Sequence, residues 1–218
     1  MDPLEEGLQL LLRYRQLSSQ PNFEIFKAAY TGNLNNFKSL ALSYAEKKGV
    51  GVGKAIGKLV DEEGKGCLLY AAEGNNVEVC KYLLETLKLD VHSKDGKGQT
   101  PLYYAIKEGD LITVRYLLEK GANVDASDDT GHTPLQCAAA MGDTTIIALL
   151  LSKGVHVDVA TKGGTALLIA VSSDHQDVVK MLLDHGANPD VVACEGMLRP
   201  LISAIYAKSW ECMDLLLQ

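Results

Sequence analysis

The feature of this sequence that most limits its fold is an internal repeat of about 33 residues. The segment GQTPLYYA at 98–105 recurs 33 residues later as GHTPLQCA at 131–138. A second segment, VRYLLEKGAN at 114–123, recurs as VKMLLDHGAN at 179–188. A fixed period of this length indicates units that stack in a row, because one unit cannot bury its own apolar face. The alanine of the first motif recurs along the chain, at Ala28, Ala71, Ala105, Ala138, Ala170 and Ala204.

The residues of one unit predict two helices joined by a turn. Thr100 is a good N-cap, and Pro101 suits the first turn of a helix, where its missing N–H costs nothing. Gly109 ends this short helix. The apolar residues of 111–118 then recur at spacings of three and four, as in a second amphipathic helix, and Gly121 suits its C-terminal cap. The sequence therefore predicts an all-α fold of helix–turn–helix units with hairpin-like turns between them.

The period and the motif resemble the ankyrin repeat over about residues 23–218, nearly the whole chain. The resemblance implies a solenoid of about six repeats, of which the first is a cap and the last is incomplete. No copy has His in the fourth position of the motif, and only two copies keep the Thr-Pro pair. We expect looser turns in the copies that replace this pair, by Gly66-Cys67, Thr165-Ala166 and Arg199-Pro200.

An insertion separates the first two copies. The interval from Ala28 to Ala71 exceeds the period by about ten residues, and KKGVGVGKAIGK at 47–58 lies within this excess. The segment resembles a phosphate-binding loop, but neither Lys54 nor Lys58 precedes Ser or Thr as that motif requires. We predict an insertion near 45–60 with a short helix of its own, and a nucleotide-binding switch or enzyme that uses 49–58 is the alternative. The predicted helix has one apolar face, made of Val52, Ile56, Leu59 and Val60.

The two ends of the chain carry further expectations. Residues 1–22 are predicted to form an N-terminal helix, Pro3–Ser18, and a linker; the helix caps the first repeat or binds a partner. The last copy reaches Gln218 inside its second helix, so apolar residues stand uncovered where other copies have core. We therefore expect that the natural chain continues into another repeat, and that this end favours weak self-association. The insertion, followed by CKYLL at 80–84, is similar to plant proteins that join ankyrin repeats to C-terminal tetratricopeptide repeats, although these 218 residues contain no such repeat.

Composition restricts the partner and the compartment. The net charge of −7 argues against nucleic acid or an anionic membrane as the main partner. No apolar run is long enough to span a bilayer, and no signal-peptide core is present, so we expect a cytoplasmic or nuclear protein. The five cysteines have no C-x-x-C spacing and the five histidines no H-E-x-x-H pattern. Buried, reduced thiols are therefore expected, with no metal and no cofactor.

No constellation for catalysis is found, and the chain is predicted not to be an enzyme. Asp174-His175 could be half of a catalytic pair, but its position in an inter-helix turn favours solvated turn residues. The acidic pairs Glu62-Glu63 and Asp128-Asp129 are expected at exposed hairpin tips, where carboxylates keep ordinary pKa values.

The predicted function is protein–protein recognition, with a purely structural spacer as a second alternative. Ankyrin proteins bind partners through the exposed ends of their first helices and through their hairpin tips, and the resemblance implies the same here. The preferred anchors are Tyr30, Met141 and Tyr206, because aromatic and Met side chains are enriched at interfaces. The other helix-end candidates are Thr31, Glu73, Lys107, Glu108, Ser172 and Ser173. The hairpin-tip candidates are Lys65, Lys97, Gln99, Asp129, Thr130, His132, Thr161, Lys162 and Glu195.

Overall fold

The computed structural model describes residues 22–191 and 199–217 as two compact units. The first unit ends at Gly96 and the second begins at Lys97. The predicted N-terminal helix, Pro3–Ser18, lies outside the described residues. Among the helices that are described, none has the length and apolarity needed to cross a bilayer.

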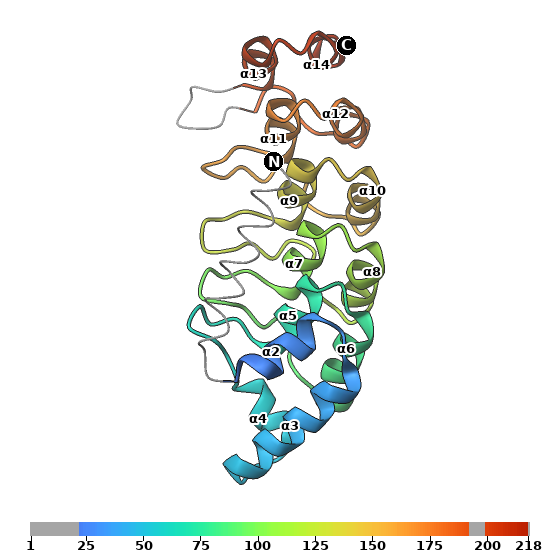
Figure 1. Ribbon diagram of the computed structural model, residues 1–218. Coiled ribbons are helices and arrows are strands. Elements are labelled where there is room, and N and C mark those ends of the chain that lie inside the picture. The colour runs from blue at the N-terminus through green and yellow to red at the C-terminus, as the bar shows by residue number, and fades with distance from the viewer. Residues whose placement is uncertain (1–21, 192–198, 218) are drawn as a thin grey trace, which may run out of the picture. The chain divides into compact units, whose positions relative to one another are not determined.

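The described residues of the first unit form two helix pairs and one extra helix (Figure 1). The second pair ends in a π-helical turn, and α2 packs against α5 while α3 packs against α4. The large side chains Phe26, Phe37 and Leu83 are buried at its centre. In chain order its elements are α2 (Phe23–Tyr30), α3 (Leu34–Lys48), α4 (Val52–Gly57), α5 (Cys67–Glu73), α6 (Val77–Lys81) and η1 (Tyr82–Thr86).

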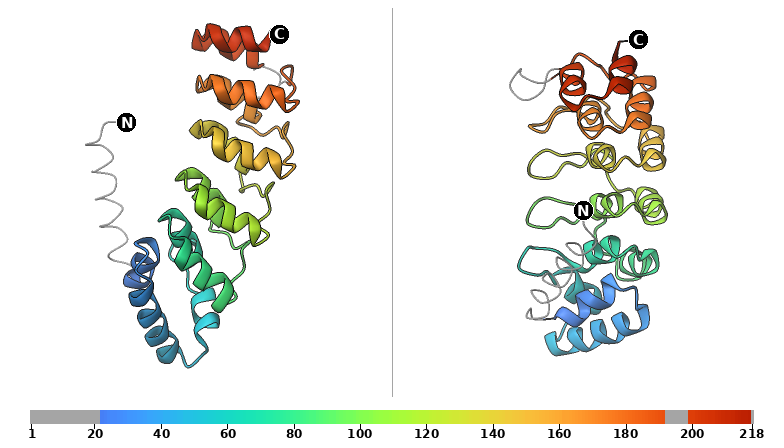
Figure 2. Two further views of the ribbon diagram at one scale, coloured as in Figure 1. Left: turned by 90° about the vertical axis from the view of Figure 1, so that its right-hand side faces the viewer. Right: turned by 45° about the horizontal axis from the view of Figure 1, so that its top comes forward.

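The described residues of the second unit form four helix pairs, which stack in two rows (Figures 1 and 2). First helices pack on first helices and second helices on second helices. The repeated alanine of each pair, from Ala105 to Ala204, is fully buried, and its small side chain lets neighbouring first helices approach closely. The pairs are α7 (Pro101–Lys107) with α8 (Leu111–Glu119), α9 (Pro134–Met141) with α10 (Thr144–Ser152), α11 (Ala166–Ser172) with α12 (Gln176–Asp184), and α13 (Pro200–Ala207) with α14 (Trp210–Leu216).

In the second unit, side-chain hydrogen bonds cap the N-termini of most first helices. The Thr100 and Thr133 hydroxyls accept hydrogen bonds from backbone N–H groups three residues later, as predicted. The looser turn expected at Thr165 is wrong, because its hydroxyl caps α11 in the same way. Gly66 and Arg199, in contrast, offer no side-chain cap to α5 and α13. The hairpin-like turns between the helix pairs form no sheet among the described residues, which contain only isolated β-bridges, Val60 with Gly66 and Thr161 with Gly164.

The insertion folds as predicted, into a short helix after the second helix of the first repeat. Gly49, at a φ of 65°, ends α3 in a left-handed conformation that few other residues adopt, and α4 follows. Ile56 and Leu59 are buried, but Val60 is 52% exposed, so the expected apolar face is shorter than predicted. Gly53 allows close packing, because a Cβ atom there would lie 2.7 Å from the carbonyl oxygen of Leu87.

The apolar side chains of the last helix pair are more exposed than those at the equivalent positions of the pair before it. Leu217 is 66% exposed and Leu216 is half-buried, whereas Leu182, which occupies the slot of Leu216 one repeat earlier, is fully buried. The uncovered apolar surface expected at this end is therefore present. Self-association through it stays a prediction.

Candidate functional site

The first-helix ends carry large apolar side chains in contact with solvent. Tyr30 at the end of α2 is 39% exposed, and Met141 at the end of α9 is 51% exposed. Tyr206 on α13 is 80% exposed. Gly142 and Lys208, both at positive φ, end α9 and α13 just after these side chains, so each is held on the last turn of a rigid helix. The remaining exposed candidates of this kind are Thr31, Lys107, Glu108, Ser172 and Ser173.

Two predicted contact residues, Lys65 and Glu73, are not on the surface. Their side chains are 1% and 3% exposed, and the Lys65 Nζ atom lies 2.6 Å from the Glu73 Oε2 atom. The expected exposure of these residues is therefore wrong. The physical reason is that a lysine beside a hairpin can fold back over the first helix when a carboxylate at the end of that helix neutralises it.

An aromatic ring and a second carboxylate complete the surroundings of this buried ion pair. The Lys65 Nζ atom lies 4.6 Å from the centre of the Tyr70 ring, in cation–π geometry. The Tyr70 hydroxyl donates a hydrogen bond of 2.6 Å to Asp61, whose other oxygen accepts from the backbone N–H of Lys65. The hairpin at 61–65 is thus bound to α5 by both its backbone and its lysine. This cluster holds the loop in place rather than presenting charge to a partner.

The hairpin tip at 128–132 is organised around one carboxylate. The Asp128 Oδ1 atom accepts hydrogen bonds from the backbone N–H groups of Thr130 and His132 and from the Thr130 hydroxyl. Burial of this carboxyl raises its pKa, but these hydrogen bonds outweigh burial and hold the pKa below its ordinary value. The ordinary pKa expected for Asp128 is therefore wrong. The Thr130 hydroxyl gives its one proton to Asp128, so the His132 Nδ1 atom, 2.6 Å away, must be the donor in their contact.

The other hairpin-tip candidates differ in exposure. Asp129 is exposed beside Thr130, and its backbone N–H donates to the carbonyl of Lys97, which links two successive loops. Lys97 and Lys162 are exposed, whereas Gln99, Thr161 and His132 are half-buried. Glu195 lies outside the described residues. The structure therefore brings several polar side chains to the tips of the second unit.

Gln136 is a structural residue that the prediction of contact sites missed. Its side chain is 2% exposed, and its Nε2 atom donates to the carbonyls of Val159 and Gly164 in the next loop, at 3.0 and 2.8 Å. Its Oε1 atom accepts from the backbone N–H of Thr133, which completes a capping box. Gln136 stands in the fourth motif position, where the ankyrin pattern has His. The polar residue at that position of the motif was the feature of the sequence that could have indicated this structural role.

Asp174 and His175 join neighbouring repeats and are more than solvated turn residues. Asp174 accepts a short hydrogen bond from the Ser209 hydroxyl, and that bond lowers the pKa of its carboxyl. The His175 Nε2 atom lies 3.1 Å from the carbonyl oxygen of Ala140, to which it donates. Each side chain therefore contacts a different neighbouring repeat. This arrangement joins three successive repeats.

The cysteines are free thiols where the structure describes them. Cys67, Cys80 and Cys212 are buried and Cys137 is half-buried. Burial raises the pKa of Cys67 and of Cys137 to about 12, so neither is a thiolate at neutral pH. Within residues 22–191 and 199–217, no group of three or more His, Cys, Asp or Glu side chains could hold a metal ion.

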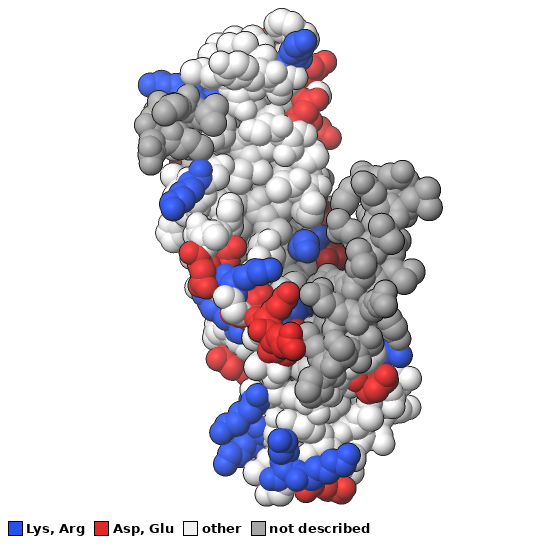
Figure 3. All heavy atoms as spheres, turned by 60° about the vertical axis from the view of Figure 1, so that its left-hand side comes forward, with Lys and Arg blue, Asp and Glu red and all other residues white. Residues whose placement is uncertain are grey.

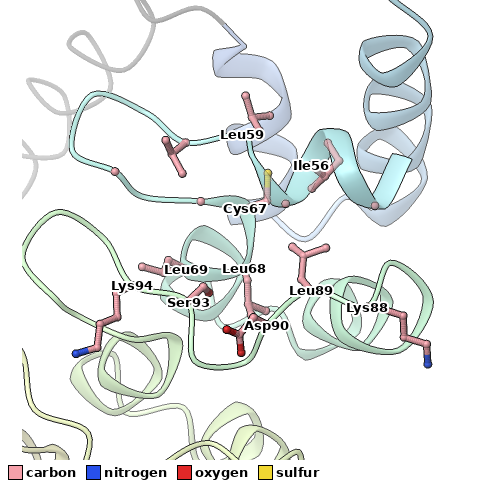
Figure 4. Close-up of a pocket in the computed structure, with 15 residues that line it drawn as sticks. Ile56, Leu59, Cys67, Leu68, Leu69, Lys88, Leu89, Asp90, Ser93 and Lys94 are labelled. Carbon is pink, nitrogen blue, oxygen red and sulfur yellow. The ribbon is translucent and has the colours of Figure 1, made fainter. Parts of the chain in front are cut away.

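The inner side of the insertion borders a cavity of about 310 Å³ (Figure 4). Its walls include the buried side chains of Ile56, Leu59 and Cys67, and Figure 4 shows the Lys88 and Lys94 side chains extending away from it. The cavity is therefore mostly apolar and presents no ammonium group to an anion. It does not have the chemistry of a phosphate-binding loop.

Capped helix pairs with a period of about 33 residues, joined by loops and stacked in a row, define a repeat protein. The chain belongs to the ankyrin-repeat family. The family model described as ankyrin repeats matches it in three copies, over residues 25–128, 123–193 and 160–218.

Known relatives and structures agree with this family. The chain is 29% identical to the human transient receptor potential cation channel subfamily A member 1 over 154 residues, which is 69% of the chain and 14% of the channel. It is 31% identical to the ankyrin repeat protein FPV022 of fowlpox virus, over 65% of the chain and 24% of that protein. The chain thus spans less than a quarter of the length of each. The crystal structure of the human ASB11 ankyrin repeat domain matches 88% of the chain, and 81% of that domain is covered, with a TM-score of 0.73 and 29% identity.

Proposed function

We propose that this chain is a protein-interaction module without catalysis that recognises a partner through its first-helix ends and hairpin tips. Ankyrin repeats generally serve as protein–protein interaction modules, and this chain has the ankyrin fold. The proposal places it in the cytoplasm or nucleus, with a protein rather than nucleic acid or membrane as the partner. The net charge of −7 supports that choice, since a polyanion would be repelled by the molecule as a whole.

The observation that carries the proposal is the exposure of large apolar side chains at the ends of first helices. Tyr30, Met141 and Tyr206 lie in the last turn of the first helix of three different repeats, and each exposes more than a third of its surface. A partner that covers such side chains gains hydrophobic burial at little cost in ordering, because each side chain is already fixed on a helix. Exposed polar residues occupy first-helix ends as well, such as Lys107, Glu108 and Ser172, and polar side chains are typical of the rim of an interface.

The test is capture of the partner by the chain and by a triple variant, Tyr30→Ala, Met141→Ala and Tyr206→Ala. Wild-type protein on a resin identifies the partner by mass spectrometry, and calorimetry then measures its affinity for both forms. We expect the triple variant to bind at least about tenfold more weakly, because truncation of a central anchor typically costs more than 1 kcal/mol.

A matched control removes exposed apolar side chains from second helices instead. Leu42, Ile112 and Trp210 are 52%, 67% and 68% exposed and lie on α3, α8 and α14. Their replacement by Ala removes a similar amount of apolar surface and should leave the affinity unchanged. Equal affinities for wild type and the first triple variant, with helix content preserved, would refute the proposed surface. A chain that captures no partner at all would favour a spacer.

A further inference from the structure

The glycine- and lysine-rich insertion carries a basic surface that the proposed interaction face does not include. Residues 47–58 contain four lysines and no acidic residue, although the chain as a whole has a net charge of −7. Lys47 and Lys48 end α3, Lys54 lies on α4 and Lys58 follows α4, and all four side chains are exposed. We call these four residues the insert lysines. Lys and Arg side chains gather in Figure 3 at the end where Figure 1 places α3 and α4.

A cleft of about 300 Å³ on the first unit lies beside the insertion, and three of the insert lysines line it. These three, Lys48, Lys54 and Lys58, stand around an apolar lining made of Tyr44, Val50 and Ala55. Val50 is 38% exposed, and the Lys48 Nζ atom lies 5.6 Å from the centre of the Tyr44 ring. No carboxylate lines this cleft among the described residues. The cleft therefore combines positive charge at its edge with an apolar surface inside.

The insert lysines have no ion-pair partner within the described part of the chain. Other lysines of the same unit do pair: Lys27 with Glu24, Lys65 with Glu73 and Lys81 with Glu78. Lys47 and Lys48 lie in the last turn of α3 and Lys54 in that of α4, where positive charge favours the helix. Four like charges within twelve residues nevertheless repel one another, and all four residues are exposed. An anionic partner would reduce this repulsion on binding, so the surface is complementary to negative charge.

The geometry of the insertion argues against a phosphate as the natural ligand. Gly49 is used for the left-handed end of α3, and Gly53 for the close approach of α4 to Leu87. A Cβ atom at Gly51 would have no neighbour within 4 Å, so nothing crowds the backbone there. The helix α4 has six residues, too few to provide a helix N-terminus for an anion. An apolar lining within the cleft fits a side chain better than it fits a phosphate group.

We infer that this surface binds an acidic peptide segment of a protein partner, in which one apolar side chain is flanked by Asp and Glu. The apolar side chain enters the cleft beside Tyr44 and Val50, and the carboxylates meet the insert lysines. This binding site lies on α3 and α4, apart from the first-helix ends and hairpin tips proposed above. It can be present whether or not that other surface binds a partner.

The test is fluorescence anisotropy with a fluorescein-labelled peptide in which one Leu is flanked on both sides by alternating Asp and Glu. We expect saturable binding at about 0.05 M salt that weakens at about 0.5 M, because salt screens exposed charges. The variant Lys48→Gln, Lys54→Gln, Lys58→Gln should bind at least about tenfold more weakly, since it removes three charges at the cleft. A control with the same change in net charge, Lys153→Gln, Lys180→Gln, Lys208→Gln, alters exposed lysines of the second unit and should bind as wild type does.

Two further comparisons test the apolar part and the class of partner. The substitution Val50→Ser should weaken binding of the Leu peptide and leave a peptide with Gly in place of Leu unaffected. Equal loss in both lysine variants would show that only net charge matters, and would overturn the inference. So would tighter binding to phosphatidylserine vesicles or to single-stranded RNA than to the peptide, with no effect of Val50→Ser. Circular dichroism of every variant confirms that helix content is kept.

Discussion

At the scale of single residues, burial decides what a charged side chain does in this molecule. Two ion pairs have the same N–O distance of 2.6 Å and different surroundings. Lys65–Glu73 is buried beneath Tyr70, whereas Lys81–Glu78 lies on the surface of α6, with side chains 42% and 68% exposed. Water can replace either partner of the surface pair. It cannot reach the buried pair, where loss of one charge leaves the other without compensation.

The first prediction follows from this contrast. The substitution Glu73→Gln keeps the size of the side chain and removes its charge, so it should lower the free energy of unfolding by about 3 kcal/mol or more. Glu78→Gln, made at the pair of equal length, should have a far smaller effect, because exposed pairs contribute little. Urea denaturation of both variants followed by circular dichroism measures the two changes. Equal losses would mean that the Lys65–Glu73 pair is as solvated as the surface pair.

At the scale of elements, the insertion shows that its glycines have different roles. Gly53 is the second residue of α4, where the helix meets the end of η1, and a Cβ atom there would come within 2.7 Å of the Leu87 carbonyl. Gly57 ends the same helix, and its Cβ would meet nothing closer than the Leu89 side chain at 4.0 Å. One glycine is therefore required by packing and the other is not.

The second prediction uses this matched pair. Gly53→Ala should destabilise the chain, because a backbone carbonyl must move by several tenths of an ångström to admit the new methyl group. Gly57→Ala should be neutral or stabilising by up to about 1 kcal/mol, since Ala favours helix more than Gly does. Thermal unfolding of both variants gives the comparison. Destabilisation by Gly57→Ala alone would contradict the position of α4 against η1.

At the scale of the whole molecule, sequence periodicity predicted the helix pairs well and the environment of individual polar residues poorly. The motif alanines, the Thr100 and Thr133 caps and the helix after Gly51 all follow from local rules that need no knowledge of neighbours. Lys65 and Glu73 could not be placed, because their burial depends on a contact between a loop and the far end of a helix. Gln136 was missed for a similar reason: its acceptors, Val159 and Gly164, lie in the next repeat. The exposure of Tyr30, Met141 and Tyr206 could be predicted, because the ends of the first helices recur with the motif. Their role as contacts stays a prediction.

The division at Gly96 and Lys97 leads to the last prediction, which concerns how the chain opens. Contacts are concentrated within each unit, and local unfolding follows such cooperative groups. Glu73→Gln breaks a buried pair of the first unit, whereas Gln136→Leu removes three backbone hydrogen-bond partners in the second. Leucine fits the Gln136 slot, since Leu168 occupies the same slot one repeat later and is buried, so this change tests the hydrogen bonds and not the volume.

Hydrogen exchange with mass spectrometry should therefore give opposite patterns for the two variants. Glu73→Gln should lower protection in α2 and α5 and leave α11 and α13 close to wild type. Gln136→Leu should lower protection in α9 and α11 and leave α2 close to wild type, because the lost hydrogen bonds joined α9 to the loop before α11. Uniform loss along the chain in both variants would show instead that the two units open as one cooperative whole.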